Sequence, residues 1–222
     1  MAIVAFDNAA FQSSGVSAAA QTILLTVTSG ATLLVAMHSN ETGTLSSVNA
    51  GGVGCTLLGY TARGNGNTQI WGLTSPAAGT LTISARLAGT TQAIWCLAAA
   101  SYVGQRTVAG SPFSTAISAN SNGTSMTYSI SSSVDDMVVT AFGTSAVSAI
   151  TIPIGYTERG SATASTTGRV VWADIAGTTG LMTFTASSAA TLEWTVLAIN
   201  IIASASAATA WKYTLGMMGV GR

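Results

Sequence analysis

The sequence predicts an all-β protein: an antiparallel, jelly-roll-like β-sandwich built from two pseudo-repeated halves and followed by a short C-terminal arm. Three observations lead to this fold class. Apolar and polar residues alternate with a period of two in several short segments, as in strands with one buried face. No long stretch combines a helical period with helix caps. Several segments recur in the same order in the two halves of the 222-residue chain.

Four segments alternate between apolar and Ser/Thr positions and predict half-buried antiparallel strands. In TILLTVT (22–28), Ile23, Leu25 and Val27 fall on one face of the strand, and the threonines fall on the other with Leu24. The same alternation occurs in three more segments: SMTYSIS (125–131), GTLTIS (79–84) and LMTFT (181–185).

Three other segments are continuously apolar and predict central strands that are covered on both faces. They are LLVAM (33–37), AIWCLAAA (93–100) and MVVTAF (137–142). Clusters of Gly, Asn and Ser, such as GNGN (64–67) and SNG (121–123), separate the strands as turns.

The two halves of the chain resemble each other segment by segment, which predicts a duplicated fold. GYTARG (59–64) returns 96 residues later as GYTERG (155–160). The other matches are 22–37 with 125–141, 79–84 with 180–185, and 91–104 with 191–204. We therefore expect a single sandwich domain over residues 1–204, with pseudo-repeats at about 20–104 and 122–204; two small sandwiches in contact are the alternative.

The segments outside the repeats differ in character. The join between the halves, residues 101–123, carries Val103, Phe113 and Ile117 and is unlike a free polar linker. The C-terminal arm, residues 205–222, has no counterpart in the first half. Its apolar residues are Trp211, Tyr213, Leu215, Met217 and Met218. Met and aromatic residues among glycines suit either packing on the arm's own sandwich or docking on a neighbour.

The low charge of the chain excludes several classes of partner. Charged residues make up 6% and the net charge is zero, so there is no basic footprint for nucleic acid and no basic face for anionic lipid. Solubility therefore depends on Ser, Thr, Asn and Gly, and a surface with few charges tolerates close contact with copies of itself or with a larger assembly.

The sequence predicts neither a membrane span nor a secretion signal. The most apolar window, residues 195–211, is interrupted by Asn200, Ser204 and Ser206. The start, MAIVAFDNAA, lacks the basic region and apolar core of a signal peptide. We expect a protein that is made and kept in a cytoplasm. Cys55 and Cys96 are too few for a disulfide framework and predict buried thiols in strands.

The repeated hexapeptide predicts two equivalent features. Each Gly-Tyr is expected to end a strand, with the tyrosine ring on the rim of the core. Arg63 and Arg159 then hold equivalent places in two turns and are candidates for contact with a neighbouring subunit. The alternative is that these arginines are solvated, since Glu158 stands beside Arg159.

The residues needed for catalysis are scarce, and the sequence predicts no enzyme. The single histidine, His38, would have to serve any Ser-His-Asp arrangement, and no GxSxG elbow is present; an exposed position at a strand end is the simpler expectation. Asp135 and Asp136 are adjacent, so in an extended segment their side chains diverge, and a turn role is favoured over paired catalysis.

No cofactor or metal site is predicted. The glycines at 51, 52 and 54 are not followed by a Lys-Ser/Thr pair or a helix, so they predict a hairpin turn or bulge and not a phosphate loop. Calcium needs six to eight oxygen ligands, and no closely spaced Asp/Asn run is present.

Carbohydrate binding is the main rival function, because sandwiches often bind sugars through exposed aromatic residues. The tryptophans are Trp71, Trp95, Trp172, Trp194 and Trp211. Trp95 and Trp194 lie at similar places within apolar segments of the two halves and are expected in the core. Trp71 and Trp172, each before a turn and a strand, look like a second structural pair.

The order of segments resembles a family of Ser/Thr/Gly-rich β-sandwich domains found in bacteriophage virion structural proteins and in large bacterial surface proteins. The segments that carry the resemblance are LLVAM, SSVNAGGVGCTLLGYT (46–61), IWGLTSPAAGTLTIS (70–84), SYVGQRTVAGSPF (101–113), DDMVVTAF (135–142) and EWTVLAINI (193–201). They cover most of residues 5–204 and indicate a fold pattern, not a catalytic signature. The resemblance implies jelly-roll-like geometry and assembly without a cofactor.

These observations together lead us to expect a non-enzymatic virion protein. The first hypothesis is a capsid decoration or cement protein that associates with itself, as a homotrimer for example, and with the major capsid protein. The second is a tail-fibre or receptor-binding module for host surface glycans. A polysaccharide hydrolase is the third.

Overall fold

The computed structural model describes residues 3–39, 41, 43–64, 66–88, 93–106 and 111–204, and confirms the all-β fold class. Its fifteen strands form three sheets, and every strand pair is antiparallel. Within these ranges there is no helix long and apolar enough to span a membrane. The C-terminal arm, 205–222, lies outside the described residues.

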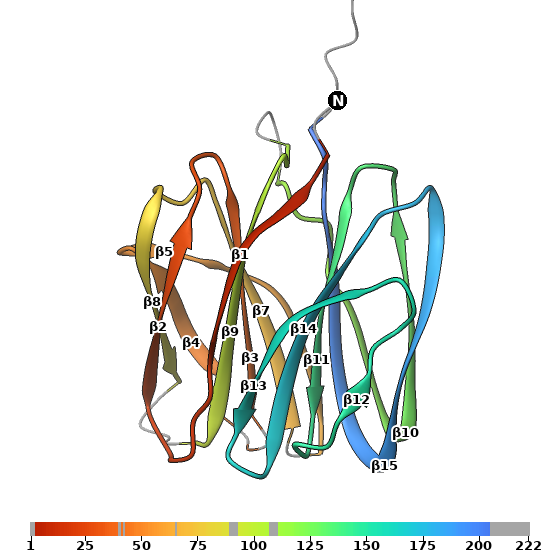
Figure 1. Cartoon of the computed structure of the whole chain (residues 1–222). Helices are drawn as coiled ribbons and strands as arrows, with labels where there is room; N and C mark the ends of the chain where they lie inside the picture. The colour runs from red at the N-terminus through yellow and green to blue at the C-terminus, as the bar shows by residue number, and fades with distance from the viewer. Residues whose placement is uncertain are drawn as a thin grey trace, which may run out of the picture.

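The first two sheets are built from the first half of the chain (Figure 1). The central sheet has the order β1 (Ala5–Gln12), β9 (Trp95–Val103), β3 (Thr32–Ser39), β7 (Gly66–Thr74) and β6 (Thr56–Arg63). The flanking sheet has the order β2 (Ala20–Val27), β8 (Gly79–Leu87), β4 (Leu45–Ala50) and β5 (Val53–Gly54).

The third sheet, which we call the folded sheet, is built from the second half. Its order is β10 (Ile117–Ser132), β15 (Gly180–Ile201), β11 (Met137–Thr144), β14 (Gly168–Ala176) and β13 (Thr157–Ala164); β12 (Ile150–Thr151) pairs with β15 away from this path. Residues 194–201 of β15 lie in the inner part of the sheet beside β11. Residues 180–187 of β15 pair with 125–132 of β10 and form a two-stranded outer ribbon.

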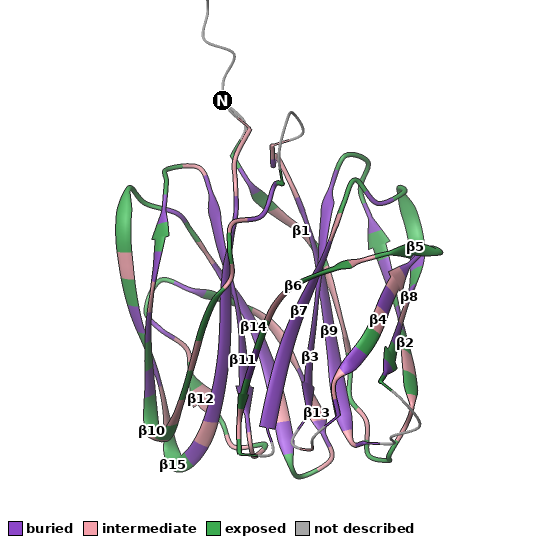
Figure 2. Cartoon of the chain, turned by 180° about the vertical axis from the view of Figure 1, so that it is seen from behind, coloured by how far each residue is buried: buried purple, intermediate pink, exposed green. Residues whose placement is uncertain are grey.

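The strands stack in four layers, with a hydrophobic core between each pair of neighbours (Figures 1 and 2). The core between the central and flanking sheets includes Leu25, Val35 and Ile83. The core between the central and folded sheets joins the two halves of the chain and includes Leu34 and Trp172. The third core fills the space between the outer ribbon and the inner part of the folded sheet.

The predictions for the alternating and the continuously apolar segments agree with this arrangement. The predicted turn at SNG (121–123) is wrong, because these residues lie within β10, where the register only shifts between Gly123 and Ser125. In β2, Ile23, Leu25 and Val27 are all buried, whereas Leu24 is 63% exposed among the threonines. The three continuously apolar segments are β3, β9 and β11, which lie inside their sheets and are buried on both faces. Alternation with a period of two therefore marks outer strands, and a continuous apolar run marks inner strands.

The repeated hexapeptide is not placed equivalently, which corrects the prediction. Gly59 and Tyr60 lie within β6, and Tyr60 is 48% exposed. Gly155 has a φ of +91° in the turn before β13, and Tyr156 is buried. Tyr156 does not lie on the rim of the core as predicted, and neither Gly-Tyr pair ends a strand, because the matching letters stand at different positions relative to the strand that follows.

Candidate interaction surfaces

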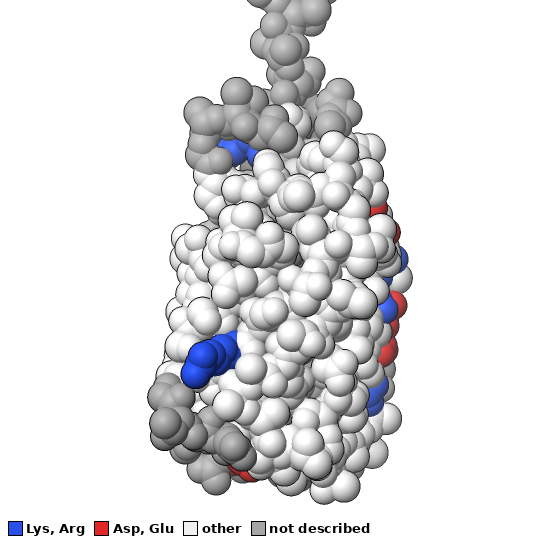
Figure 3. Space-filling model, turned by 90° about the vertical axis from the view of Figure 1, so that its left-hand side faces the viewer, with Lys and Arg blue, Asp and Glu red and all other residues white. Residues whose placement is uncertain are grey.

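The outer face of the flanking sheet is a nearly uncharged array of hydroxyl groups. Thr26 and Thr80 face each other across β2 and β8, with their Oγ1 atoms 3.1 Å apart. Arg86 is the one charged residue in β2, β4, β5 and β8. Figure 3 looks onto this side of the molecule, where charged atoms gather along one edge and most of the remaining surface is uncharged.

The outer ribbon presents a similar face on the opposite side of the stack. The Oγ1 atoms of Thr127 and Thr185 are 2.8 Å apart, and Ser129 Oγ lies 2.7 Å from Thr183 Oγ1. No charged residue occurs in residues 125–132 or 180–187. Both ends of the four-layer stack therefore carry polar surfaces with few charges, since the exposed Arg86 of the flanking sheet is the one charged residue in these strands, and contact requires little desolvation of charge.

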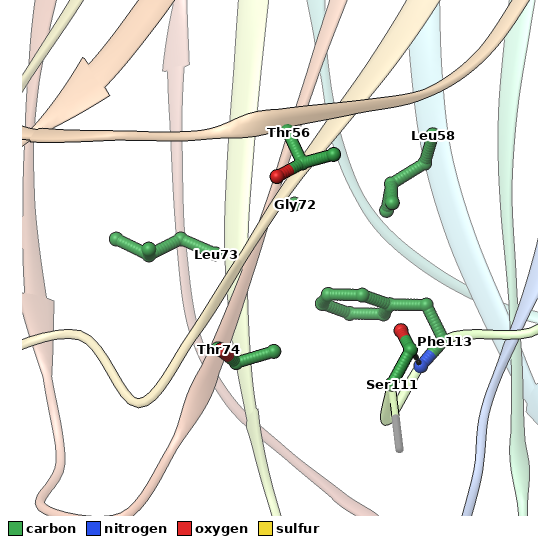
Figure 4. A pocket seen from close by; sticks show the side chains of 7 residues that line it. All are labelled: Thr56, Leu58, Gly72, Leu73, Thr74, Ser111 and Phe113. Carbon is green, nitrogen blue, oxygen red and sulfur yellow. Dashed lines mark hydrogen bonds between the residues drawn. The ribbon is translucent and has the colours of Figure 1, made fainter.

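A groove of about 290 Å³ with a largely apolar lining lies beside β6 and β7 (Figure 4). Its lining residues are Thr56, Leu58, Gly72, Leu73, Thr74, Ser111 and Phe113. A Cβ atom at Gly72 would lie 2.5 Å from Leu58 Cδ1 and 2.7 Å from Phe113 Cε2, so glycine is needed for both side chains to approach β7. The sequence singled out Phe113 as apolar but gave no sign that it lines a recess.

His38 is a core residue, and the expectation that it is exposed at a strand end is wrong. Its side chain is 1% exposed, and Nδ1 lies 3.0 Å from Thr68 Oγ1 and 3.4 Å from Thr195 Oγ1. Burial lowers the pKa of His38 to about 4, so the ring is neutral at pH 7. The imidazole ties the central sheet to the folded sheet and does not face solvent.

The carboxylates serve turns and sheet contacts. Asp135 occupies a turn at φ +74°, and the Asp136 carboxylate accepts hydrogen bonds from Ser133 N (3.2 Å) and Ala203 N (2.8 Å). The predicted turn role is confirmed. Burial opposes ionisation of Asp7, but hydrogen bonds from Thr28 and Ser101 hold its pKa below the ordinary value.

Neither a metal cluster nor a reactive thiol is found in the part of the chain that the structure describes. No group of three or more His, Cys, Asp or Glu residues is close enough there to hold a metal ion. Cys96 is buried in β9, and burial raises the pKa of its thiol to about 12. The prediction of a buried thiol in a strand is wrong for Cys55, which is half-buried and lies between β5 and β6; burial raises its pKa to about 11.

Arg159 lies within β13 and not in a turn, and it is engaged inside the chain. Its Nε and Nη2 atoms each donate to the Asp174 carboxylate at 2.8 Å, and its guanidinium lies 4.1 Å from the centre of the Phe6 ring. Asp174 also accepts from the Tyr102 hydroxyl at 3.0 Å, which in turn accepts from Trp172 Nε1 at 2.8 Å. This network links the central and folded sheets.

The other predicted interface residues are placed as follows. Arg63 is the last residue of β6 and is half-buried, so it does not repeat the environment of Arg159. The five arm residues, Trp211, Tyr213, Leu215, Met217 and Met218, lie outside the described residues.

The tryptophans in the described residues do not form a sugar-stacking platform. Trp95 and Trp194 are fully buried, as predicted, and each indole N–H donates to a backbone carbonyl at 2.9 Å. Trp71 is also buried, at 8% exposed. Trp71 and Trp172 are not a structural pair, because they belong to cores on opposite faces of their sheets.

Comparison with known proteins gives no relative from which a function could be transferred. The chain matches no family model, no curated protein and no solved structure.

Proposed function

We propose that this chain is a non-enzymatic bacteriophage virion structural protein that decorates or cements the capsid by self-association and by docking on the shell. The observation that carries the proposal is the pair of Ser/Thr faces at the two ends of the stack, on which Arg86 is the one charged residue. The sequence resemblance described above supplies the virion context.

Two physical features support this role. Close contact with a repeating shell is easier for a surface whose hydroxyl groups already bond to one another, because few charges lose their hydration. Antiparallel strand pairs and three stacked cores also give a stiff body for a protein that reinforces an assembly.

The proposal is tested by mixing the full chain with capsids that lack it and measuring co-sedimentation. We expect binding that saturates at a fixed ratio to the major capsid protein. A chain that stays monomeric and ignores capsids contradicts the proposal.

Matched lysine variants then identify the docking face. Thr82→Lys lies on the outer face of the flanking sheet, and Thr183→Lys lies on the outer ribbon. Both positions are exposed, so both variants should fold. Capsid binding should weaken in the variant whose lysine enters the contact and persist in the other; unchanged binding in both would exclude these two faces.

A further inference from the structure

The groove defined above is shaped for one aromatic or large aliphatic side chain. Its volume of about 290 Å³ is at the lower end of ligand pockets, which hold roughly 300–1,000 Å³. The Phe113 ring forms one wall and Leu58 another, and both side chains approach the backbone of Gly72, which has no Cβ atom to keep them apart (Figure 4).

The lining also indicates what kind of side chain fits. It contains no charged residue, and the hydroxyl-bearing residues Thr56, Thr74 and Ser111 lie around the apolar walls. Phe113 offers a ring for aromatic pairing, and a hydroxyl at the rim can accept from an indole N–H. A tryptophan meets both conditions with a single side chain.

The described chain ends beside this groove. Ile201 forms a β-bridge with Phe113, and Ile202 N donates to Pro112 O at 2.7 Å. Ser204 N donates to Gly104 O at 3.2 Å, so residue 205 starts close to the segment that carries the Phe113 wall.

The arm that follows is long enough to return to the groove. Trp211 is seven residues beyond Ser204, and an extended chain spans at most about 3.3–3.6 Å per residue. A side chain and a site that are joined by a short linker meet at an effective concentration in the millimolar range, which favours the chain's own arm over the arm of another copy.

From these observations we propose that the groove is the socket for Trp211 of the same chain. The arm thereby closes the apolar recess between Leu58 and Phe113. This inference goes beyond the proposed function and does not depend on it, because shielding of Trp211 and binding to capsids are separate measurements.

The test uses ¹⁹F NMR of the full chain labelled with 5-fluorotryptophan, in which Trp211→Phe assigns one of five resonances. A soluble nitroxide reports exposure by line broadening. Trp211 should be shielded in the parent. Thr56→Phe, which fills the groove from an exposed rim position, should increase the nitroxide broadening of the Trp211 resonance several-fold. Thr82→Phe, an exposed substitution on the flanking sheet, is the matched control and should leave Trp211 shielded.

Thr74→Phe is a second filling variant in case Thr56→Phe disturbs β6. Broadening of Trp211 in the parent, or full shielding in both filling variants, would overturn the proposal. Shielding that disappears on dilution would place a neighbour's arm in the groove and overturn the assignment to the same chain.

Discussion

The two halves of the molecule cover their inner sheets with outer layers of different construction. In the first half the flanking sheet has four strands, and no strand belongs to both the flanking and the central sheet. For example, β1 ends before β2 begins, and β8 ends before β9 begins. In the second half, β10 and β15 run without interruption from the outer ribbon into the inner part of the folded sheet.

The second outer layer compensates for its smaller number of strands with larger side chains. The core beneath the flanking sheet is rich in aliphatic residues, whereas the core beneath the outer ribbon contains an aromatic cluster. Tyr128, Phe142, Tyr156 and Phe184 form edge-to-face or tilted pairs with centroids 4.8–6.4 Å apart. Aromatic rings bury about 150–250 Å² each, so a few of them fill a layer that two strands alone cover poorly.

Replacing the two tryptophans that the sequence predicts to be equivalent tests whether the cores of the two halves are built in the same way. Trp95→Ala and Trp194→Ala each remove a fully buried indole and its hydrogen bond to a backbone carbonyl. Each should lower the free energy of unfolding by about 3–5 kcal/mol, measured by chemical denaturation. A large loss in one variant and a small loss in the other would contradict the equivalence.

Gly143 of the folded sheet lies against His38 of the central sheet, and the space between them leaves no room for a further side chain. A Cβ atom at Gly143 would collide with Thr68 Oγ1, His38 Nδ1 and Thr195 Oγ1. Gly143→Ala should cost about 1–3 kcal/mol by overpacking, and the cost should be smaller in a His38→Ala background. Gly15→Ala is the control, since nothing lies within 4 Å of an added Cβ there.

The same histidine should give the protein a measurable pH dependence. Its pKa is about 4 in the folded chain against about 6.5 when unfolded, so protonation below pH 6.5 favours the unfolded state. Between pH 7 and pH 5 the His38 contribution should fall by about 2 kcal/mol, and it should continue to fall until the folded pKa is reached. His38→Gln should flatten this part of the unfolding profile. An unchanged slope in this variant would assign the pH dependence to other groups.

The tyrosine hydroxyls in the second core should contribute less. The Tyr128 hydroxyl lies 2.9 Å from that of Tyr156 and 3.1 Å from Thr140 Oγ1. Burial, followed by the neighbouring Tyr156, raises the pKa of Tyr128 well above its ordinary value. Tyr128→Phe should reduce the free energy of unfolding by about 1 kcal/mol, because it removes these bonds and keeps the ring. A loss as large as that of a ring deletion would show that packing had changed too.

Substitutions on the outer faces should have the smallest effect on stability. Thr26→Val and Thr127→Val each remove one hydroxyl from an exposed cross-strand pair. Both should change the free energy of unfolding by less than about 0.5 kcal/mol. A larger loss on the outer ribbon than on the flanking sheet would show that the two-stranded layer depends on its hydroxyl pairs.

The sequence was sufficient to predict the strands, because a period of two and a continuous apolar run report burial directly. It placed Ile23, Leu25 and Val27 on the buried face of β2 and identified β3, β9 and β11 as inner strands. It did not reveal four stacked layers, since a continuous strand such as β15 changes layers through its path in space and not through its composition.

The partners of polar residues were harder to predict than the strands. Identical letters in GYTARG and GYTERG stand at different positions relative to the pairing strand, so Tyr60 is exposed and Tyr156 is buried. Arg159 and Asp174 lie on neighbouring strands whose register is visible only in the fold. The groove beside Phe113 is lined by residues of β6, of β7 and of the segment 111–113, and the sequence of none of these segments alone predicts a groove.

The position of β1 has a consequence for how the chain is synthesised. Within the central sheet β1 pairs with β9 alone, so residues 5–12 cannot pair until the ribosome has made residues 97–103. At about 5–20 residues per second, the ribosome needs roughly 5–20 seconds to make the intervening chain. Meanwhile β3, β7 and β6 can already pair with one another. We therefore expect the central sheet to grow from its middle during translation, with the first strand made being the last to join.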